Sequence, residues 1–135
     1  PTARPVDSLE PVTTATEILE LQQQVTAVRM EDSVKDYLVR VVQATRTHGA
    51  VYLGASPRAS LSLYRLSQAL AAVLGRDYVL PDDIKQLAPL VLAHRLVLQP
   101  EARWQGTDPE SVVQEILASV PVPVEQHGRL IFARP

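Results

Sequence analysis

Apolar side chains recur every three or four residues in five stretches of this chain, separated by short polar segments that contain Pro or Gly. This spacing places the apolar residues on one face of an α-helix, so each stretch predicts an amphipathic helix. Residues 1–13 hold three prolines and few apolar anchors, which predicts an extended linker. The pattern therefore predicts an all-α fold, a compact bundle of about five helices, with short extended segments allowed at connectors and at the C-terminus.

The first two helices are predicted between residues 14 and 47. Thr14 and Glu17 have the spacing of a capping box at the start of the first helix. Asp32 is a good N-cap for the second helix, and Gly49 is expected to end it in a left-handed conformation. Residues 27–30 are compatible with a short extended connector. The apolar positions of the two helices are Ile18, Leu21, Val25 and Val28, then Val34, Tyr37, Leu38, Val41, Val42 and Thr45.

The third helix is predicted from Pro57 to Leu74 and is expected to form the spine of the domain, with Gly75 as its stop. The fourth helix is predicted to start at Pro81, and Pro89 is expected to kink or interrupt it. The pattern from Leu96 to Gln105 is irregular, and Trp104 is expected to cover the edge of the core. The inward stripe predicted for the third helix is Ala59, Leu63, Leu66, Leu70 and Val73.

A fifth helix is predicted after Thr107 and Glu110, which have capping-box spacing, with Asp108 as the alternative N-cap. Its inward residues are Val113, Ile116, Leu117 and Val120, and Pro121 follows them. The last residues form either an edge strand or a docking tail. The predicted organisation is thus a linker at 1–13, a helical domain at 14–124 and a tail at 125–135.

Composition narrows the possible functions. The 135 residues carry a formal net charge of −2 and no cysteine, which excludes disulfides and thiolate metal sites and gives no general attraction to nucleic acid. No apolar run is long enough to span a bilayer, so we expect a cytoplasmic protein without membrane insertion. The chain does not begin with Met, so we expect it to be a piece of a longer protein.

The segment Gly54-Ala55-Ser56-Pro57-Arg58-Ala59 carries the most informative chemistry. Ser56 is predicted to cap the third helix at Pro57, which places Arg58 in the first turn. A cation there opposes the helix dipole unless an anion shares the site. Free backbone N–H groups beside an arginine fork make a candidate phosphate site, and the alternative is a solvated arginine.

Other candidate sites are incomplete. The sequence contains no phosphate-binding loop of the Gly-x-x-x-x-Gly-Lys type, and no companion motif surrounds His48, His94 or His127. Asp82 and Asp83 are more consistent with helix capping than with metal binding, because no third ligand has suitable spacing. The same two acids weaken a helix-turn-helix interpretation, since they would face DNA phosphates.

Several segments, in order, resemble the C-terminal lid of the MoxR family of AAA+ ATPases. The likeness covers nearly the whole chain up to about residue 124. The family usually has Thr where Leu80 precedes Pro81, which removes one cap. The segments are Thr45-Arg46-Thr47-His48, Val51-Tyr52-Leu53, Gly54 to Ala59, Gly75-Arg76-Asp77-Tyr78-Val79, Pro81-Asp82-Asp83-Ile84, Val91-Leu92-Ala93-His94-Arg95-Leu96 and Val120-Pro121-Val122-Pro123.

The resemblance implies a helical lid over ATP and Mg²⁺ that are bound by an upstream AAA+ core, with no cofactor held by this fragment alone. It implies that Arg58 is the sensor arginine, with Ala55, Ser56 and Pro57 beside the nucleotide. It also implies ATP hydrolysis by the full-length protein, which acts as a chaperone-like remodelling ATPase. The implied partners are a homo-hexameric ring and proteins with a von Willebrand factor A-type domain.

Two questions stay open at the level of sequence. The alternative function is a stand-alone helical protein-interaction module, whose upstream flank would encode no phosphate loop. The sequence also leaves undecided whether Arg46, Arg65 or Arg95 joins Arg58 near nucleotide or a neighbouring subunit. Arg65 shares the face of Arg58 but lies about 10 Å further along the helix axis.

Overall fold

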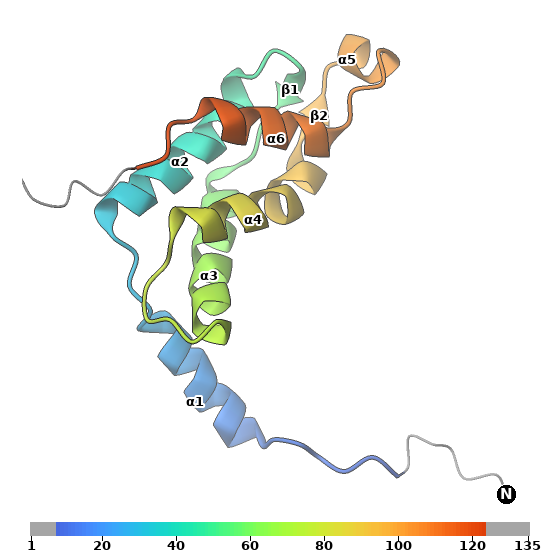
Figure 1. Cartoon of the computed structure of the whole chain (residues 1–135). Coiled ribbons are helices and arrows are strands. Elements are labelled where there is room, and N and C mark those ends of the chain that lie inside the picture. The colour runs from blue at the N-terminus through green and yellow to red at the C-terminus, as the bar shows by residue number, and fades with distance from the viewer. Residues whose placement is uncertain (1–7, 124–135) are drawn as a thin grey trace, which may run out of the picture.

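The computed structural model of the chain describes residues 8–123. Its helices are α1 (Ala15–Thr26), α2 (Asp32–Thr47), α3 (Pro57–Val73), α4 (Pro81–Leu92), α5 (Pro100–Trp104) and α6 (Pro109–Ser119), and the 3-10 helix η2 (Ala93–Arg95) follows α4 directly. The strands β1 (Val51–Leu53) and β2 (Val97–Leu98) pair antiparallel (Figure 1). The predicted helical bundle is therefore confirmed, while β2 and α5 occupy the stretch that had no clear pattern.

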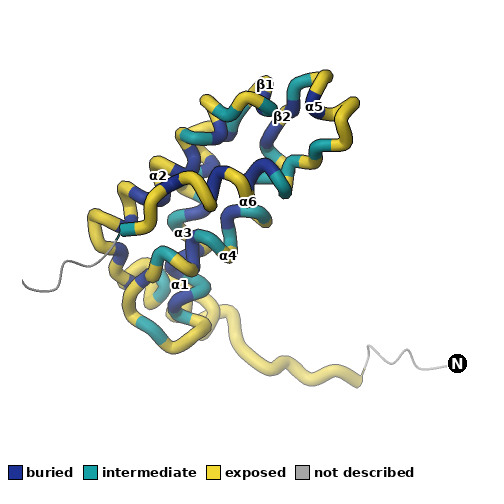
Figure 2. Tube along the Cα trace, turned by 45° about the horizontal axis from the view of Figure 1, so that its top comes forward, coloured by how far each residue is buried: buried dark blue, intermediate teal, exposed yellow. Residues whose placement is uncertain are grey.

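The core lies where α2, α3, α4 and α6 meet. Buried residues concentrate on these four helices in Figure 2, whereas α1 is exposed over most of its surface. The amphipathic patterns of α2 and α6 predicted this core correctly, because every residue of both predicted stripes is buried. The largest side chains with almost no exposure are Tyr37, Leu63, Ile84, Leu92 and Ile116.

Helix α1 begins as predicted but does not enter the core. The Glu17 N–H donates to Thr14 Oγ1 at 3.2 Å, and the Thr14 N–H donates to Glu17 Oε2 at 2.7 Å, which is a complete capping box. No residue of α1 is buried, and Ile18 and Leu21 are exposed. Figure 1 shows α1 projecting beyond one end of α3. Its apolar stripe therefore faces no other part of the described chain along most of its length.

The ends of α2 differ from the prediction. Glu31 is the N-cap, and Asp32 is the first helical residue, paired with Lys35 at 2.9 Å. His48 caps the other end in an extended conformation, and Gly49 has no positive φ. The left-handed stop expected at Gly49 was therefore wrong, because the chain turns directly from His48 towards β1.

Helix α3 starts at Pro57 and ends one residue earlier than predicted, at Val73. Gly75 has φ of +73°, and the Arg76 N–H donates to the Ala71 carbonyl at 2.9 Å, so the predicted glycine stop is confirmed. The predicted inward stripe was only partly right. Ala59 and Leu63 are buried and Leu70 is half-buried, but Leu66 and Val73 are exposed.

Two polar residues take the inward positions of α3 instead. The buried positions follow a spacing of four, from Ala59 through Leu63 and Ser67 to Ala71, which turns Leu66 towards solvent. Gln68 is also buried, and its Nε2 donates to the Val28 carbonyl at 2.7 Å. That bond satisfies a carbonyl of the connector between α1 and α2, which pairs with the α3–α4 connector at Arg29 and Tyr78 and is extended at that point.

Asp83 caps α4 and forms a partly buried ion pair that the sequence pattern did not indicate. Its Oδ2 accepts from the Leu80 N–H at 2.8 Å, and its two carboxylate oxygens accept from Arg76 at 2.7 and 2.9 Å. This bond to Asp83 raises the pKa of Arg76. The capping role predicted for Asp83 is confirmed. The helix continues through Pro89 to Leu92, so Pro89 does not interrupt it.

The C-terminal part of the described chain begins with Asp108, which caps α6 by accepting from the N–H groups of Glu110 and Ser111. The alternative cap was therefore the correct one. Trp104 is 83% exposed, so the expectation that it covers the core was wrong. The tail predicted at 125–135 lies outside the described residues. Within residues 8–123, no helix is long and apolar enough to cross a membrane.

Candidate functional site

The loop before α3 is fixed to the end of α2 by both backbone groups of Ala55. The Ala55 N–H donates to Thr45 Oγ1 at 2.9 Å, and the Ala55 carbonyl accepts from Arg46 Nε at 2.9 Å. Ala55 and Thr45 are fully buried. The sequence pattern placed Thr45 among the inward, mostly apolar positions of α2. A polar residue at such a position was the signal that could have indicated this role. The Thr45 hydroxyl makes α2 the anchor of the residues that precede Arg58.

Gly54 brings this loop into direct contact with α2. A Cβ built at Gly54 would lie 2.8 Å from the backbone N and Cα of Arg46, closer than real Cβ atoms approach backbone. Gly54 needs no positive φ, so close approach rather than backbone conformation explains the glycine. Any side chain at this position must push the loop away from α2 and lengthen the bonds to Ala55.

We expect Gly54→Ala to destabilise the chain by about 1–3 kcal/mol, the usual cost of forcing extra atoms into a packed site. Gly49→Ala is the matched control, because no atom lies within 4 Å of a Cβ built there. The control should change stability by less than about 0.5 kcal/mol. Urea unfolding followed by circular dichroism measures both, and equal stability of the two variants would contradict the packing argument.

The start of α3 is positively charged and lacks an acid. Ser56 is the N-cap, as predicted, but its side chain makes no capping bond. The first turn contains Arg58 and no acidic residue. Arg58 is exposed, and its guanidinium has no hydrogen-bond or ion-pair partner among residues 8–123. Its backbone N–H has no acceptor there either, so cation and helix end both face solvent.

The other arginines near the site have different surroundings. The Nε of Arg46 donates to the Ala55 carbonyl, so Arg46 helps to hold the loop before α3. Arg95 reaches α3, where its Nη2 lies 3.4 Å from Ser62 Oγ. Ser62 Oγ in turn donates to the Arg58 carbonyl at 3.1 Å. Of the three arginines that the sequence left undecided, Arg95 is therefore the one that contacts the first turns of α3 beside Arg58.

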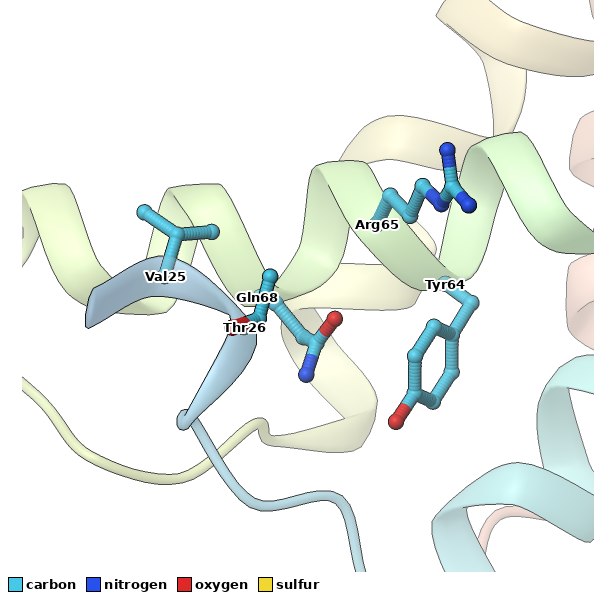
Figure 3. Close-up of a pocket in the computed structure, with 5 residues that line it drawn as sticks. All are labelled: Val25, Thr26, Tyr64, Arg65 and Gln68. Carbon is cyan, nitrogen blue, oxygen red and sulfur yellow. The ribbon is translucent and has the colours of Figure 1, made fainter. Parts of the chain in front are cut away.

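Arg65 belongs to a separate surface pocket of about 470 Å³ between α1 and α3. The pocket is lined by Val25 and Thr26 of α1 and by Tyr64, Arg65 and Gln68 of α3. Figure 3 shows the Arg65 guanidinium extending away from the Tyr64 ring and the Gln68 amide. The polar end of Arg65 therefore does not converge with theirs, and the pocket gathers no set of catalytic groups.

The remaining titratable residues do not assemble a reactive centre. His48 Nε2 lies 3.2 Å from Glu115 Oε2, and its Nδ1 accepts from the Ala50 N–H. No group of three or more His, Asp or Glu residues in the described range is placed to hold a metal ion. The site around Arg58 offers donors and positive charge, which suit phosphate oxygens but not Mg²⁺. A nucleotide contacted by Arg58 would need its metal held by other residues.

Comparison with known proteins agrees with these features. Residues 43–116 match the family model of the AAA lid domain, and this range contains Arg58 and Arg95. The chain is 47% identical to the uncharacterized protein YeaC of Bacillus subtilis over 124 residues. It is 38% identical to the chaperone MoxR1 of Mycobacterium tuberculosis over 128 residues. These alignments cover 92% and 85% of this chain but only 39% and 34% of the two relatives.

A solved structure shares the fold. A crystal structure from Cytophaga hutchinsonii, described as a "putative ATPase", superposes with a TM-score of 0.78 at 32% sequence identity. The match covers 81% of this chain and 36% of that one. The family match spans more than half of the chain, and the relatives with descriptive names are MoxR proteins. The chain therefore belongs to the AAA lid domain family and is a lid of the MoxR type.

Proposed function

We propose that this chain is the nucleotide-sensing lid of a MoxR-type AAA+ ATPase and that Arg58 is its sensor arginine. The observation that carries the proposal is the isolated cation at the start of α3. No acid shares its turn, and no described group pairs with it. An unpaired arginine whose own backbone N–H is also free at a helix start is suited to phosphate oxygens. Ala55, Ser56 and Pro57 would border the same nucleotide.

The chemistry asked of Arg58 is electrostatic. Phosphoryl transfer proceeds by positioning and by neutralising charge on the transferred group, and arginine does both through its planar fork. ATP and Mg²⁺ would be bound by a core domain upstream of this chain. Because Arg58 sits on a separate domain, its contact with the terminal phosphate would also couple the angle of the lid to the nucleotide state. The chain by itself would not hydrolyse ATP.

The anchoring of the Gly54–Ala55 loop supports this role. A sensor residue must hold its position relative to the rest of the lid if its contact with phosphate is to move the whole domain. Thr45 and Arg46 fix Ala55 from α2, three residues before Arg58. The pull of a phosphate on Arg58 would therefore be transmitted to α2 as well as to α3.

Assembly and partners extend the same proposal. AAA+ proteins act as oligomers, and we propose a homo-hexameric ring for the full-length protein. The relative from Mycobacterium tuberculosis is named a chaperone. By analogy, ATP hydrolysis would drive the remodelling or maturation of client proteins, including those with a von Willebrand factor A-type domain. A cytoplasmic location is part of this proposal.

A second candidate is a protein-interaction module with no nucleotide role. The exposed apolar residues of the projecting helix α1, such as Leu19 and Leu21, favour it. The two candidates differ in how nucleotide affinity depends on Arg58. A preference for ATP over ADP that disappears in Arg58→Ala supports the sensor, and a preference that survives the change contradicts it.

A further inference from the structure

Arg95 reaches the candidate phosphate site from a different part of the chain. It ends η2, the turn that follows α4, and it is half-buried. Its Nη2 donates to Ser62 Oγ at 3.4 Å, and Ser62 bonds the Arg58 carbonyl. Ser62 lies one helical turn beyond Arg58, so the two residues share a face of α3. The guanidinium of Arg95 therefore lies over the face that carries Arg58.

The contacts of Arg95 orient its fork without neutralising it. Its Nε donates to His94 Nε2 at 3.3 Å, which requires an unprotonated Nε2 on His94. Both acceptors, Ser62 and His94, are uncharged in this arrangement. A guanidinium has five N–H groups, and these bonds use two of them. The others have no acceptor among the described residues, so the fork keeps its charge and most of its donors.

The charge around Arg58 and Arg95 is unbalanced. Elsewhere in the described chain, Arg29, Lys35, Arg76 and Lys85 each pair with an aspartate, whereas Arg40, Arg46, Arg65 and Arg103 have no carboxylate partner and lie apart from one another along the chain. Neither Arg58 nor Arg95 has a carboxylate partner there, and α3 contains no acidic residue. Arg95 meets α3 at Ser62, one turn beyond Arg58, so both cations lie on the first turns of the helix, at its positive end. An anion bound there would be attracted by both arginines and by the helix end.

From this juxtaposition, and resting on the proposed function, we propose that Arg95 is a second anion-binding residue. It contacts the phosphate chain of the nucleotide whose terminal phosphate Arg58 contacts. The two arginine forks would share the oxygens of one polyphosphate, a geometry that guanidinium groups favour. The competing role for Arg95 is structural, in which it only packs η2 against α3 through Ser62.

The test measures ATP turnover and thermal unfolding of the full-length protein that carries this lid. The variants are Arg95→Gln, Arg95→Lys, Arg58→Ala and the double variant Arg58→Ala with Arg95→Gln. Arg103→Met, on α5, is the control for loss of one exposed arginine. We expect Arg95→Gln to lower kcat/KM for ATP about tenfold, which equals about 1.4 kcal/mol. Its melting temperature should match that of the control.

Two further results are expected if both arginines bind one anion. Arg95→Lys should recover part of the lost kcat/KM because it keeps the charge. The double variant should lose less than the product of the two single losses, since residues that act on one group are coupled. Three results together would assign Arg95 the structural role. The kcat/KM of Arg95→Gln would fall together with its melting temperature, and Arg95→Lys would recover none of the loss. The loss in the double variant would equal the product of the two single losses.

The outcomes also separate this inference from the proposed function. If Arg58→Ala lowers turnover while Arg95→Gln behaves like Arg103→Met, the anion-binding role of Arg95 is wrong and the sensor role of Arg58 stands. If neither arginine affects turnover, both are wrong. If Arg95→Gln does not fold, the double variant Ser62→Ala with Arg95→Lys takes its place, because it keeps the charge of residue 95 and removes its contact with Ser62. Anion binding by Arg95 requires this double variant to retain more ATP turnover than Arg58→Ala. Equal losses of turnover would overturn that role.

Discussion

If the proposed function holds, replacing Arg58 by Ala in the full-length protein is expected to lower ATP turnover about a hundredfold, the loss typical of removing one preorganised group that stabilises charge in the transition state. Arg58 is exposed, and its side chain has no partner among the described residues. The substitution should therefore leave the melting temperature unchanged. Steady-state hydrolysis measured by phosphate release, with circular dichroism melting in parallel, gives both readouts.

Arg103→Met is the matched control for the Arg58 experiment. Arg103 is an exposed arginine on the short helix α5 and makes no ion pair within residues 8–123. Its loss changes the net charge by the same amount as Arg58→Ala and should leave turnover within about twofold of wild type. Equal turnover in Arg58→Ala and Arg103→Met would contradict a sensor role for Arg58.

Replacing Asp83 by Ala is expected to destabilise the chain by about 2–3 kcal/mol, because it breaks a partly buried ion pair with Arg76 and removes the cap of α4. The side chain of Asp83 is 5% exposed and that of Arg76 is 20% exposed. The variant also removes the acceptor of the Leu80 N–H at the start of α4. A fall of about 10 °C in melting temperature corresponds to this loss.

Asp82→Ala is the control for the Asp83 experiment. Asp82 precedes Asp83 in the same turn of α4, but its side chain is 82% exposed and pairs with Lys85 across one turn. Exposed pairs of this kind contribute about 0.2–1 kcal/mol. Similar melting temperatures for the two variants would show that the Arg76–Asp83 pair does not stabilise the fold.

Local patterns predicted the elements that depend on neighbouring residues. The capping box of Thr14 and Glu17, the start of α3 at Pro57 and the stop at Gly75 each follow from residues within one or two turns. The unusual charge of Arg58 was visible for the same reason, because the dipole and the missing acid belong to its own turn. The role we propose for Arg58 also depends on the family resemblance, because the nucleotide that it would contact is not bound by this chain.

Long-range contacts account for most of what the sequence did not reveal. The bond of Arg95 to Ser62 and the bonds of Thr45 and Arg46 to Ala55 join different elements, and no periodicity reports them. Ser67 and Gln68 are polar but buried on α3, whereas the apolar Leu66 beside them is exposed, the opposite of what hydrophobicity predicts. The burial of such residues can be predicted only once the packing of α3 against its neighbours is known.

Errors in the predicted surface have a common physical cause. Helical spacing placed the apolar residues Leu66 and Val73 inside, and Trp104 was expected at the edge of the core, yet all three are exposed. The apolar stripe of α1 likewise faces no other described element along most of its length. Apolar pattern predicts that a surface prefers burial, but it does not say whether the covering partner belongs to the same chain.

The central claim is that Arg58 contacts the terminal phosphate of a nucleotide bound by another domain. Calorimetric titration of the full-length protein with a non-hydrolysable ATP analogue and with ADP tests it most directly, in wild type and in Arg58→Ala. The claim predicts that wild type binds the ATP analogue more tightly than ADP and that Arg58→Ala weakens only the analogue, by about tenfold or more. An equal preference for the analogue in both proteins would contradict it.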